Sequence, residues 1–301
     1  MTAVTTETKH PLIEVLRLIS AFLIVWYHSE LAFGHELAYS GLIVFVFLSA
    51  YYSGASKKIS IDFHSKVSRF IWPWLFWSLI YGVGYVATGR PFFKYHHDLF
   101  SQVLVGNSIH LWYLPFIFLV LVSLDILKNL FGYMLVAIVL YFSALFYFIL
   151  AESWRPFSLG LPVPFPQYFH ALGAVFVGFY WGALNRKTSN HKLNWLDWSA
   201  LIALMSFAFF SVELAGFGLP YSVGVILAVV FLVIEVDPRF FSNIKEFSDC
   251  SYGIYLVHPI LLHLFGIGKL GYLTPVVVFA ISFFVIYYCR QRFPVVSRYV
   301  T

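Results

Sequence analysis

The amino-acid sequence predicts an all-α integral membrane protein. We expect one domain, residues 1–301, built as a bundle of about ten transmembrane helices with both termini in the cytoplasm. The first reason is composition: 60% of the 301 residues are hydrophobic and 11% are charged, whereas soluble domains carry roughly 25% charged residues. The mean hydropathy is +0.81. A soluble fold of this size cannot bury so much apolar surface, so the bilayer must act as its solvent.

The second reason is a series of ten apolar segments, each about 18 to 22 residues long, which is the length that a helix needs to cross the hydrocarbon core. They are apolar on every face and lack the alternation of β-barrel strands. The fifth and seventh have the least polar separation from their neighbours. In order, the segments are Leu12–Gly34, Leu37–Gly54, Phe70–Ala87, Ile109–Ile126, Leu130–Ala151, Gln167–Leu184, Trp195–Ala215, Leu219–Val236, Ser251–Gly268 and Tyr272–Cys289.

The third reason is the distribution of Lys and Arg, which collect in cytoplasmic loops of membrane proteins. With the N-terminus inside, 14 of the 19 basic residues lie on the cytoplasmic side, four lie outside, and Arg17 lies within the first segment. This asymmetry also favours an even number of spans. The inside residues are Lys9, Lys57, Lys58, Lys66, Arg69, Lys128, Arg186, Lys187, Lys192, Arg239, Lys245, Arg290, Arg292 and Arg298. The outside residues are Arg90, Lys94, Arg155 and Lys269.

The two longest loops, Thr88–Ser108 and Glu152–Pro166, are both expected outside. The second holds four prolines, which favours an ordered cap over a helix. The first segment carries Glu14 and Arg17 and has no small-residue cleavage site, so we do not expect a cleavable signal peptide. No internal repeat and no separate soluble domain are expected.

Charge and cysteine content exclude some classes of function. The net charge is +5, but the basic residues lie in short loops and form no basic face, so we expect no binding of nucleic acid. Cys250 and Cys289 fall near cytoplasmic loops, where a disulfide is not expected. Neither has the spacing of a metal-binding motif, so no metal site is predicted.

Arg17 and His28 are ionisable residues within an apolar segment, which makes them functional candidates. They are eleven residues apart, about 20° past three full helical turns, so they share one stripe about 16 Å apart along the axis. A guanidinium fork suits a phosphate, and a neutral imidazole suits a general base. Together they predict a phosphate-bearing donor with a long arm. Each alone has a simpler interpretation, a snorkelling cation and a packing hydrogen bond.

Polar residues also mark the ends of the third and fourth segments. Arg69, close to Lys66, begins the third at its cytoplasmic end, either as a second cation for the donor or as an instance of the positive-inside rule. Pro73 is expected in the first helical turn, where a missing N–H costs little. His110 and Trp112 begin the fourth segment at its outer end, at the depth of His28, although an aromatic belt explains Trp112 alone.

The ninth segment carries His258 about 10 Å in from the cytoplasmic side. The next residue, Pro259, frees a backbone carbonyl one turn back, which a cavity or a side chain must satisfy. His258 is therefore either a site residue or a buried residue held by a packing hydrogen bond.

These stretches, in this order, resemble the membrane-bound acyltransferase 3 family, whose first helix carries an Arg and a His with ten residues between them. Ala50 stands where that family usually has Gly, and Trp74 where it usually has Tyr. Residues 130–236 match no motif of the family. The matching stretches are Ile13–Ala21 with Trp26–His28, Leu48–Tyr51, Arg69–Trp77, Leu111–Leu114 and Ser251–His258.

The resemblance implies a multi-pass protein of the bacterial cytoplasmic (inner) membrane. It would move an acyl group, most often acetyl or succinyl, from cytoplasmic acyl-CoA to a hydroxyl of a surface glycan or its lipid-linked precursor. The expected partners are acyl-CoA, the glycan acceptor and the bilayer, with no permanently bound cofactor. The oligomeric state is not predicted.

The resemblance also assigns roles. His28 would be the general base, with Arg17, Arg69 and Lys66 at the donor's phosphates. Direct attack of the acceptor hydroxyl is expected, and an acyl-His28 intermediate stays open. The remaining candidates for substrate contacts or for an oxyanion site are Ser49, Trp112, Tyr255 and His258.

Two other classes of function compete with an enzyme. A transporter or flippase for a lipid-linked glycan predicts Gly- or Pro-broken spans at corresponding places in two halves of the chain. Pro73, Pro115 and Pro259 show no such symmetry. A membrane scaffold would not need Arg17 and His28 on one helix face.

Overall fold

The computed structural model describes residues 11–29, 32–56, 61–95, 98–185, 218–234, 244–265 and 271–294, with isolated positions 199, 202, 203, 206 and 297. Every regular element in these ranges is a helix, as the sequence predicts. The elements are α1 (Pro11–Tyr27), η1 (Leu37–Tyr39), α2 (Ser40–Ala55), α3 (Phe63–Lys66), η2 (Val67–Ile71), α4 (Trp72–Ala87), α5 (Leu99–Val105), η3 (Ile109–Trp112), α6 (Tyr113–Phe131), α7 (Tyr133–Ile149), α8 (Ala151–Leu159), α9 (Phe165–Asn185), α11 (Leu219–Val233), α12 (Ile244–Ser248), α13 (Ser251–Phe265), η5 (Gly271–Leu273) and α14 (Thr274–Arg292).

Several of these helices are long and apolar enough to cross a bilayer. Among the described residues four pass by length and composition: Leu37–Ala55, Phe63–Ala87, Ile109–Phe131 and Gly271–Arg292. Helices α7 and α8, bent by 80° at their junction, make a fifth if they count as one span. The chain is therefore a multi-pass membrane protein. The expected seventh segment lies almost wholly outside the described residues, and the total of ten spans and the cytoplasmic termini stay predictions.

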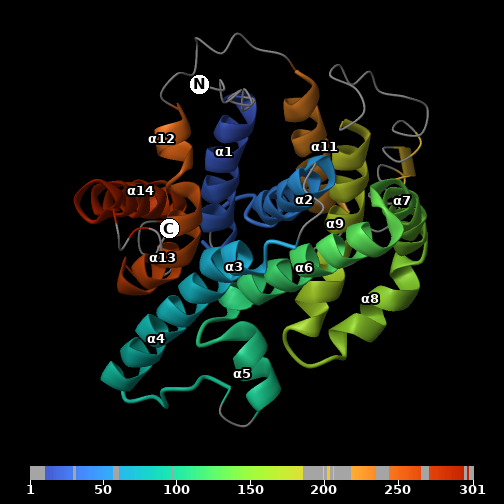
Figure 1. Ribbon diagram of the computed structural model, residues 1–301. Coiled ribbons are helices and arrows are strands. Elements are labelled where there is room, and N and C mark those ends of the chain that lie inside the picture. The colour runs from blue at the N-terminus through green and yellow to red at the C-terminus, as the bar shows by residue number, and fades with distance from the viewer. Residues whose placement is uncertain are drawn as a thin grey trace, which may run out of the picture.

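Helix α2 is at the centre of the bundle. It packs on α1, α6, α9 and α11, and Figure 1 shows it between α1 and α9. Its contact with α9 depends on glycines. A Cβ added to Gly178 would lie 2.4 Å from the Phe47 carbonyl oxygen, and one added to Gly182 would lie 2.0 Å from that of Tyr51. Small residues of this kind let membrane helices approach backbone to backbone.

Helix α1 ends at Tyr27, seven residues before the end of the expected segment. The reason is local hydrogen bonding. The Ser29 hydroxyl donates to the Val25 carbonyl at 2.9 Å, and the Trp26 indole N–H donates to the Phe33 carbonyl at 2.9 Å. The second bond joins residue 33 to the end of the helix, and His28 lies in the turn that terminates α1 and not within a longer helix.

The third span begins seven residues earlier than expected, at Phe63, where Asp62 caps the helix by accepting from the Ser65 N–H at 3.1 Å. As the sequence predicts, Pro73 lies in the first turn of α4, although this helix continues directly from the segments before it. It follows the π-helical segment η2, in which the Trp72 N–H bonds the Val67 carbonyl. A π turn shifts the hydrogen-bond register by one residue, which lets the helix continue through a residue that has no N–H.

The two long loops contain helices. Helix α5 lies in Thr88–Ser108, and Asp98 caps it by accepting from the Phe100 and Ser101 N–H groups. The expectation of a non-helical cap at Glu152–Pro166 was wrong for its first half, because α8 runs through Pro156. The carbonyl that this proline leaves without a donor belongs to Glu152, an exposed residue at the start of the helix.

Candidate active site

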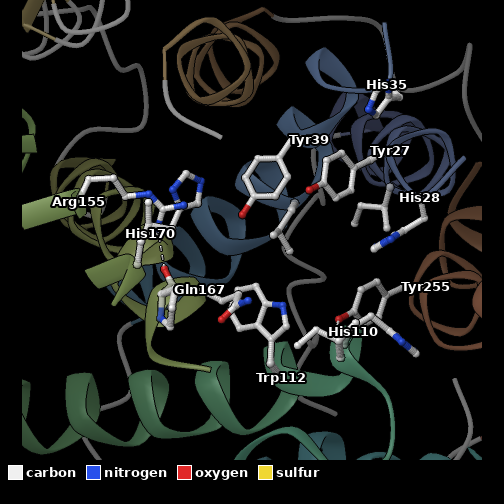
Figure 2. Close-up of a pocket in the computed structure, with 15 residues that line it drawn as sticks. Tyr27, His28, His35, Tyr39, His110, Trp112, Arg155, Gln167, His170 and Tyr255 are labelled. Carbon is white, nitrogen blue, oxygen red and sulfur yellow. Dashed lines mark hydrogen bonds between the residues drawn. The ribbon is translucent and has the colours of Figure 1, made fainter. Parts of the chain in front are cut away.

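A cavity of about 650 Å³ lies beyond the end of α1, and we call it the histidine cavity. Figure 2 shows its polar side chains converging from α1, η1, η3, α8, α9 and α13. Four imidazoles, three tyrosines and one tryptophan dominate its wall. Its lining residues are Ile24, Tyr27, His28, His35, Tyr39, Leu42, Ile109, His110, Trp112, Arg155, Leu159, Pro166, Gln167, His170 and Tyr255.

His28 reaches this cavity because α1 stops one residue before it. Its N–H still donates to the Ile24 carbonyl at 3.2 Å, which keeps the residue in helical register. Its ring packs against Tyr27 at 5.1 Å between ring centroids. The candidate base therefore lines a cavity whose volume is large enough for a small molecule.

Three imidazoles from distant parts of the chain meet beside the cavity. The rings of His28 and His258 are 5.1 Å apart between centroids, and those of His258 and His110 are 5.8 Å apart. Their elements are the end of α1, η3 and α13. The sequence placed His110 at the depth of His28, and the structure shows both lining the histidine cavity.

His258 is fully buried, and one of its ring nitrogens has a defined role. Nδ1 lies 3.2 Å from the Ile254 carbonyl oxygen. Because a carbonyl only accepts, Nδ1 must carry the proton, which leaves Nε2 with a lone pair. Nε2 has no hydrogen-bond partner among the described residues.

The other predicted residues near His28 have hydrogen-bond partners in this state. The Tyr255 hydroxyl donates to the His110 carbonyl. The Ser49 hydroxyl donates to the Phe45 carbonyl at 2.8 Å and lies 3.2 Å from the Tyr113 hydroxyl. Trp112 lines the histidine cavity, whereas Ser49 lies in a second one.

The second cavity, of about 770 Å³, lies along the N-terminal half of α1, and we call it the arginine cavity. It brings together Arg17 and Arg69, as the sequence predicts for a donor site. Its lining residues are Glu14, Arg17, Ile24, Leu42, Phe45, Leu48, Ser49, Tyr52, His64, Ser65, Ser68, Arg69, Phe70, Tyr113, Leu121, Asp249, Tyr252, Tyr255 and Arg290.

The cations of the arginine cavity differ in their neighbours. Arg17 contacts the Glu14 carboxylate at 2.8 Å and lies 3.9 Å from Asp249. Arg290 lies 3.5 Å from the same aspartate. Arg69 packs over the Phe70 ring at 5.3 Å and makes no ion pair with any described residue.

Lys66, also predicted at the donor, lies elsewhere. Its ammonium pairs with the Asp125 carboxylate, which also holds Lys128 at 2.8 Å. Lys128 in turn donates to the Ser53 carbonyl at 3.0 Å. Lys66 does not line the arginine cavity. These contacts join α3 to α6 and to the end of α2. Lys66 directly precedes η2, the segment that carries Arg69.

The two cavities meet at three side chains. Ile24, Leu42 and Tyr255 line both of them, and we call these residues the septum. The histidine cavity lies at the C-terminal end of α1 and the arginine cavity along its N-terminal half. The septum is therefore where the two cavities adjoin.

Sequence reasoning missed several lining residues. Arg290 was counted only as a cytoplasmic charge, and Asp249 was not singled out. Arg155, Gln167 and His170 lie in the part of the chain that matched no motif. Arg155 donates to the Pro166 carbonyl at 3.0 Å, and Figure 2 shows it beside His170, across the cavity from His28. No short-range pattern links residues on α8 and α9 to the end of α1, so only the fold reveals them.

Comparison with known proteins agrees with this geometry at the level of the family. No curated protein and no solved structure matches the chain. A family model described as an acyltransferase domain, Acyl_transf_3, matches residues 11–290. The match runs from α1 to α14, and so includes every element that lines the two cavities. The resemblance read from the motifs is therefore confirmed: the chain belongs to the acyltransferase 3 family of membrane proteins.

Proposed function

We propose that the protein is a membrane O-acyltransferase that moves a short acyl group, acetyl or succinyl, from cytoplasmic acyl-CoA to a hydroxyl of a surface glycan or its lipid-linked precursor. We place it in the bacterial cytoplasmic (inner) membrane. The observation that carries the proposal is the pair of cavities at opposite ends of α1 that share the septum. Such an arrangement lets two substrates approach one reaction point from the two sides of a bilayer.

The arginine cavity suits the donor. Coenzyme A carries several phosphate groups, and guanidinium forks bind phosphate by paired hydrogen bonds. Arg17, Arg69 and Arg290 line this cavity, which is on the cytoplasmic side in the predicted orientation. The pantetheine arm would extend toward the septum and carry the thioester to His28.

The histidine cavity suits a sugar acceptor. Aromatic rings such as Trp112 and Tyr39 offer apolar faces for a sugar ring, and Gln167 adds an amide that both donates and accepts. No family motif reaches α8 and α9, which form one side of this cavity. This is where differences in acceptor between members of one family are expected.

The chemistry is a single displacement. His28 accepts the proton of the acceptor hydroxyl while the oxygen attacks the thioester carbonyl carbon. The carbon–sulfur bond then breaks, the ester stays on the acceptor, and the leaving thiolate takes up the proton. Acyl-CoA and alcohol thus give ester and free coenzyme A, with no other reactant required.

The test uses purified full-length protein in lipid nanodiscs with labelled acetyl-CoA or succinyl-CoA and a membrane glycolipid extract. Wild-type protein should release coenzyme A thiol and transfer label to the extract. His28→Ala should lower both rates by about 10²- to 10⁴-fold, the usual contribution of a general base, with acyl-CoA binding unchanged.

The matched control is His263→Ala, because His263 is an exposed histidine on α13; its rates should equal those of wild type. Full activity in His28→Ala would remove the assigned base. A wild-type protein that releases no thiol from either donor would contradict the enzyme function and favour a transporter.

A further inference from the structure

We propose that His258 is the positioning residue of His28: its Nε2 lone pair accepts the N–H of the His28 ring and so selects the tautomer in which the other nitrogen of His28 faces the acceptor. This inference rests on the proposed function. It gives His258 a role different from the oxyanion contact that the sequence suggested.

The first step is that only one ring nitrogen of His258, Nε2, is open to a new hydrogen-bond partner. It is 0% exposed, and its Nδ1–H is committed to the Ile254 carbonyl. Pro259 has no N–H to offer the carbonyl of Tyr255, four residues before it, and that carbonyl is a second acceptor beside His258. Since Nδ1–H bonds the Ile254 carbonyl, the ring cannot turn over without losing this bond, and Nε2 stays unprotonated.

The second step is that Nε2 needs a donor. A buried polar atom without a partner costs roughly 1–3 kcal/mol, and Nε2 has none among the described residues. A neighbouring ring that carries an N–H can supply this donor. The described side chains in ring contact with His258 are His28, His110 and Tyr255, and the Tyr255 hydroxyl is already committed to a carbonyl.

The third step chooses His28 over His110. An N–H···N bond of about 2.9 Å between two imidazoles places their centroids about 5 Å apart. The His28–His258 separation is 5.1 Å with the planes tilted by 36°, whereas His110 is 5.8 Å away and steeply inclined at 62°. A small rotation of His28 about its own side chain completes the bond. His110 has the Ser108 hydroxyl 2.9 Å from its Nδ1, and its Nε2 has no hydrogen-bond partner among the described residues, so the choice of His28 rests on the shorter separation and smaller tilt of its ring.

The consequence concerns the direction of proton transfer. When His28 gives its N–H to His258, its second nitrogen carries the lone pair that a base requires. Figure 2 shows the His28 side chain entering the histidine cavity on the side of His110 and Tyr255. After His28 takes the proton of the acceptor, the N–H···N bond to the neutral ring of His258 becomes charge-assisted and stronger. His258 thus acts only through His28.

The experiment compares His258→Gln with His258→Phe. Glutamine keeps an acceptor near the position of Nε2, and phenylalanine keeps the ring volume without any lone pair. We expect His258→Phe to lower kcat by about 10²-fold, the effect of a misplaced catalytic group, with the KM for acetyl-CoA unchanged. His258→Gln should recover at least tenfold of that loss, and added imidazole should partly restore His258→Ala.

An activity-independent readout separates this inference from the proposed function. Diethyl pyrocarbonate modifies a neutral imidazole nitrogen, and mass spectrometry gives the rate at His28. That rate should change in His258→Phe and return toward wild type in His258→Gln, whether or not the protein turns over acetyl-CoA. His263→Ala is the control for both readouts.

Equal losses in His258→Gln and His258→Phe, or an unchanged rate of His28 modification in both, would overturn the inference, because a packing role does not depend on a lone pair. The wild-type protein could release no thiol while the rate of His28 modification still depends on a hydrogen-bond acceptor at position 258. That result would support the contact between His28 and His258 and contradict the enzyme function.

Discussion

At the residue scale, the arginines of the arginine cavity differ in their electrostatic surroundings. Arg17 is balanced by Glu14, whose carboxylate also accepts from the Ser248 hydroxyl at 2.5 Å. Arg69 has only the ring of Phe70 and makes no ion pair with a described residue. A phosphate that enters this cavity competes with a carboxylate for Arg17 but not for Arg69. Arg69 is therefore the cation whose geometry should matter most for donor affinity.

We predict that Arg69→Lys raises the Kd for coenzyme A about tenfold or more, since a hydrogen bond to a charged group contributes roughly 1.5–3 kcal/mol and lysine cannot form the paired bonds of a guanidinium. Isothermal titration in nanodiscs measures the affinity. Arg90→Lys, in the exposed loop after α4, is the matched control and should bind as wild type does. An unchanged Kd in Arg69→Lys would remove this residue from the donor site.

Sequence alone found the residues of the site that short motifs carry. Arg17 lies on α1 and His28 in the turn directly after it, so helical spacing was enough to link the two residues. Arg155 and His170 could not be predicted from the sequence, because they line the same cavity as His28 only through the way α8 and α9 pack in the fold. Lys66 shows a different limit: its position near Arg69 suggested a donor contact, but the sequence did not reveal that its ammonium pairs with the Asp125 carboxylate on α6.

At the element scale, the glycines between α2 and α9 fix the position of the central helix and hence of both cavities. Gly178 and Gly182 have no room for a methyl group, because backbone atoms of α2 occupy the space. Backbone cannot move aside as a flexible side chain can. The sequence predicted both helices from their apolar length, but not their contact, because glycines occur in apolar segments for several reasons.

We predict that Gly182→Ala lowers the free energy of unfolding by about 1–3 kcal/mol, the usual cost of overpacking, and weakens acyl-CoA binding as α2 shifts. Gly84→Ala is the control. Gly84 lies in α4 with no atom within 4 Å of an added Cβ, so alanine should leave stability unchanged or raise it by up to roughly 1 kcal/mol. Thermal unfolding of the two variants in one detergent measures the change in stability. A Gly182→Ala protein as stable as wild type would contradict the close approach of α9 to α2.

At the scale of the whole molecule, composition was sufficient to predict a helical membrane protein, and the family match extends over nearly all of it. Segment ends were less predictable. Helix α1 stops early because of side-chain bonds from Ser29 and Trp26, and the third span starts early at the Asp62 cap. Hydropathy measures apolar length and cannot register such bonds.

The orientation is testable with single cysteines in a protein whose Cys250 and Cys289 are replaced by serine. Arg90→Cys and Ile61→Cys both place the thiol at exposed positions. A membrane-impermeant maleimide should label the first in intact spheroplasts and the second only after permeabilisation, because the distribution of Lys and Arg puts residue 90 outside and residue 61 inside. The reverse pattern would invert the assignment of donor and acceptor sides.

The septum has an electrical consequence. Water in the two cavities would make the transmembrane voltage fall mainly across the thin barrier between them, formed by Ile24, Leu42 and Tyr255. Each 100 mV is worth roughly 2.3 kcal/mol per elementary charge that crosses the full field. A proton that passes from His28 to a thiolate on the cytoplasmic side moves inward, down the gradient of a cell that is negative inside. Turnover should then accelerate in an energised membrane and slow when an ionophore collapses the potential.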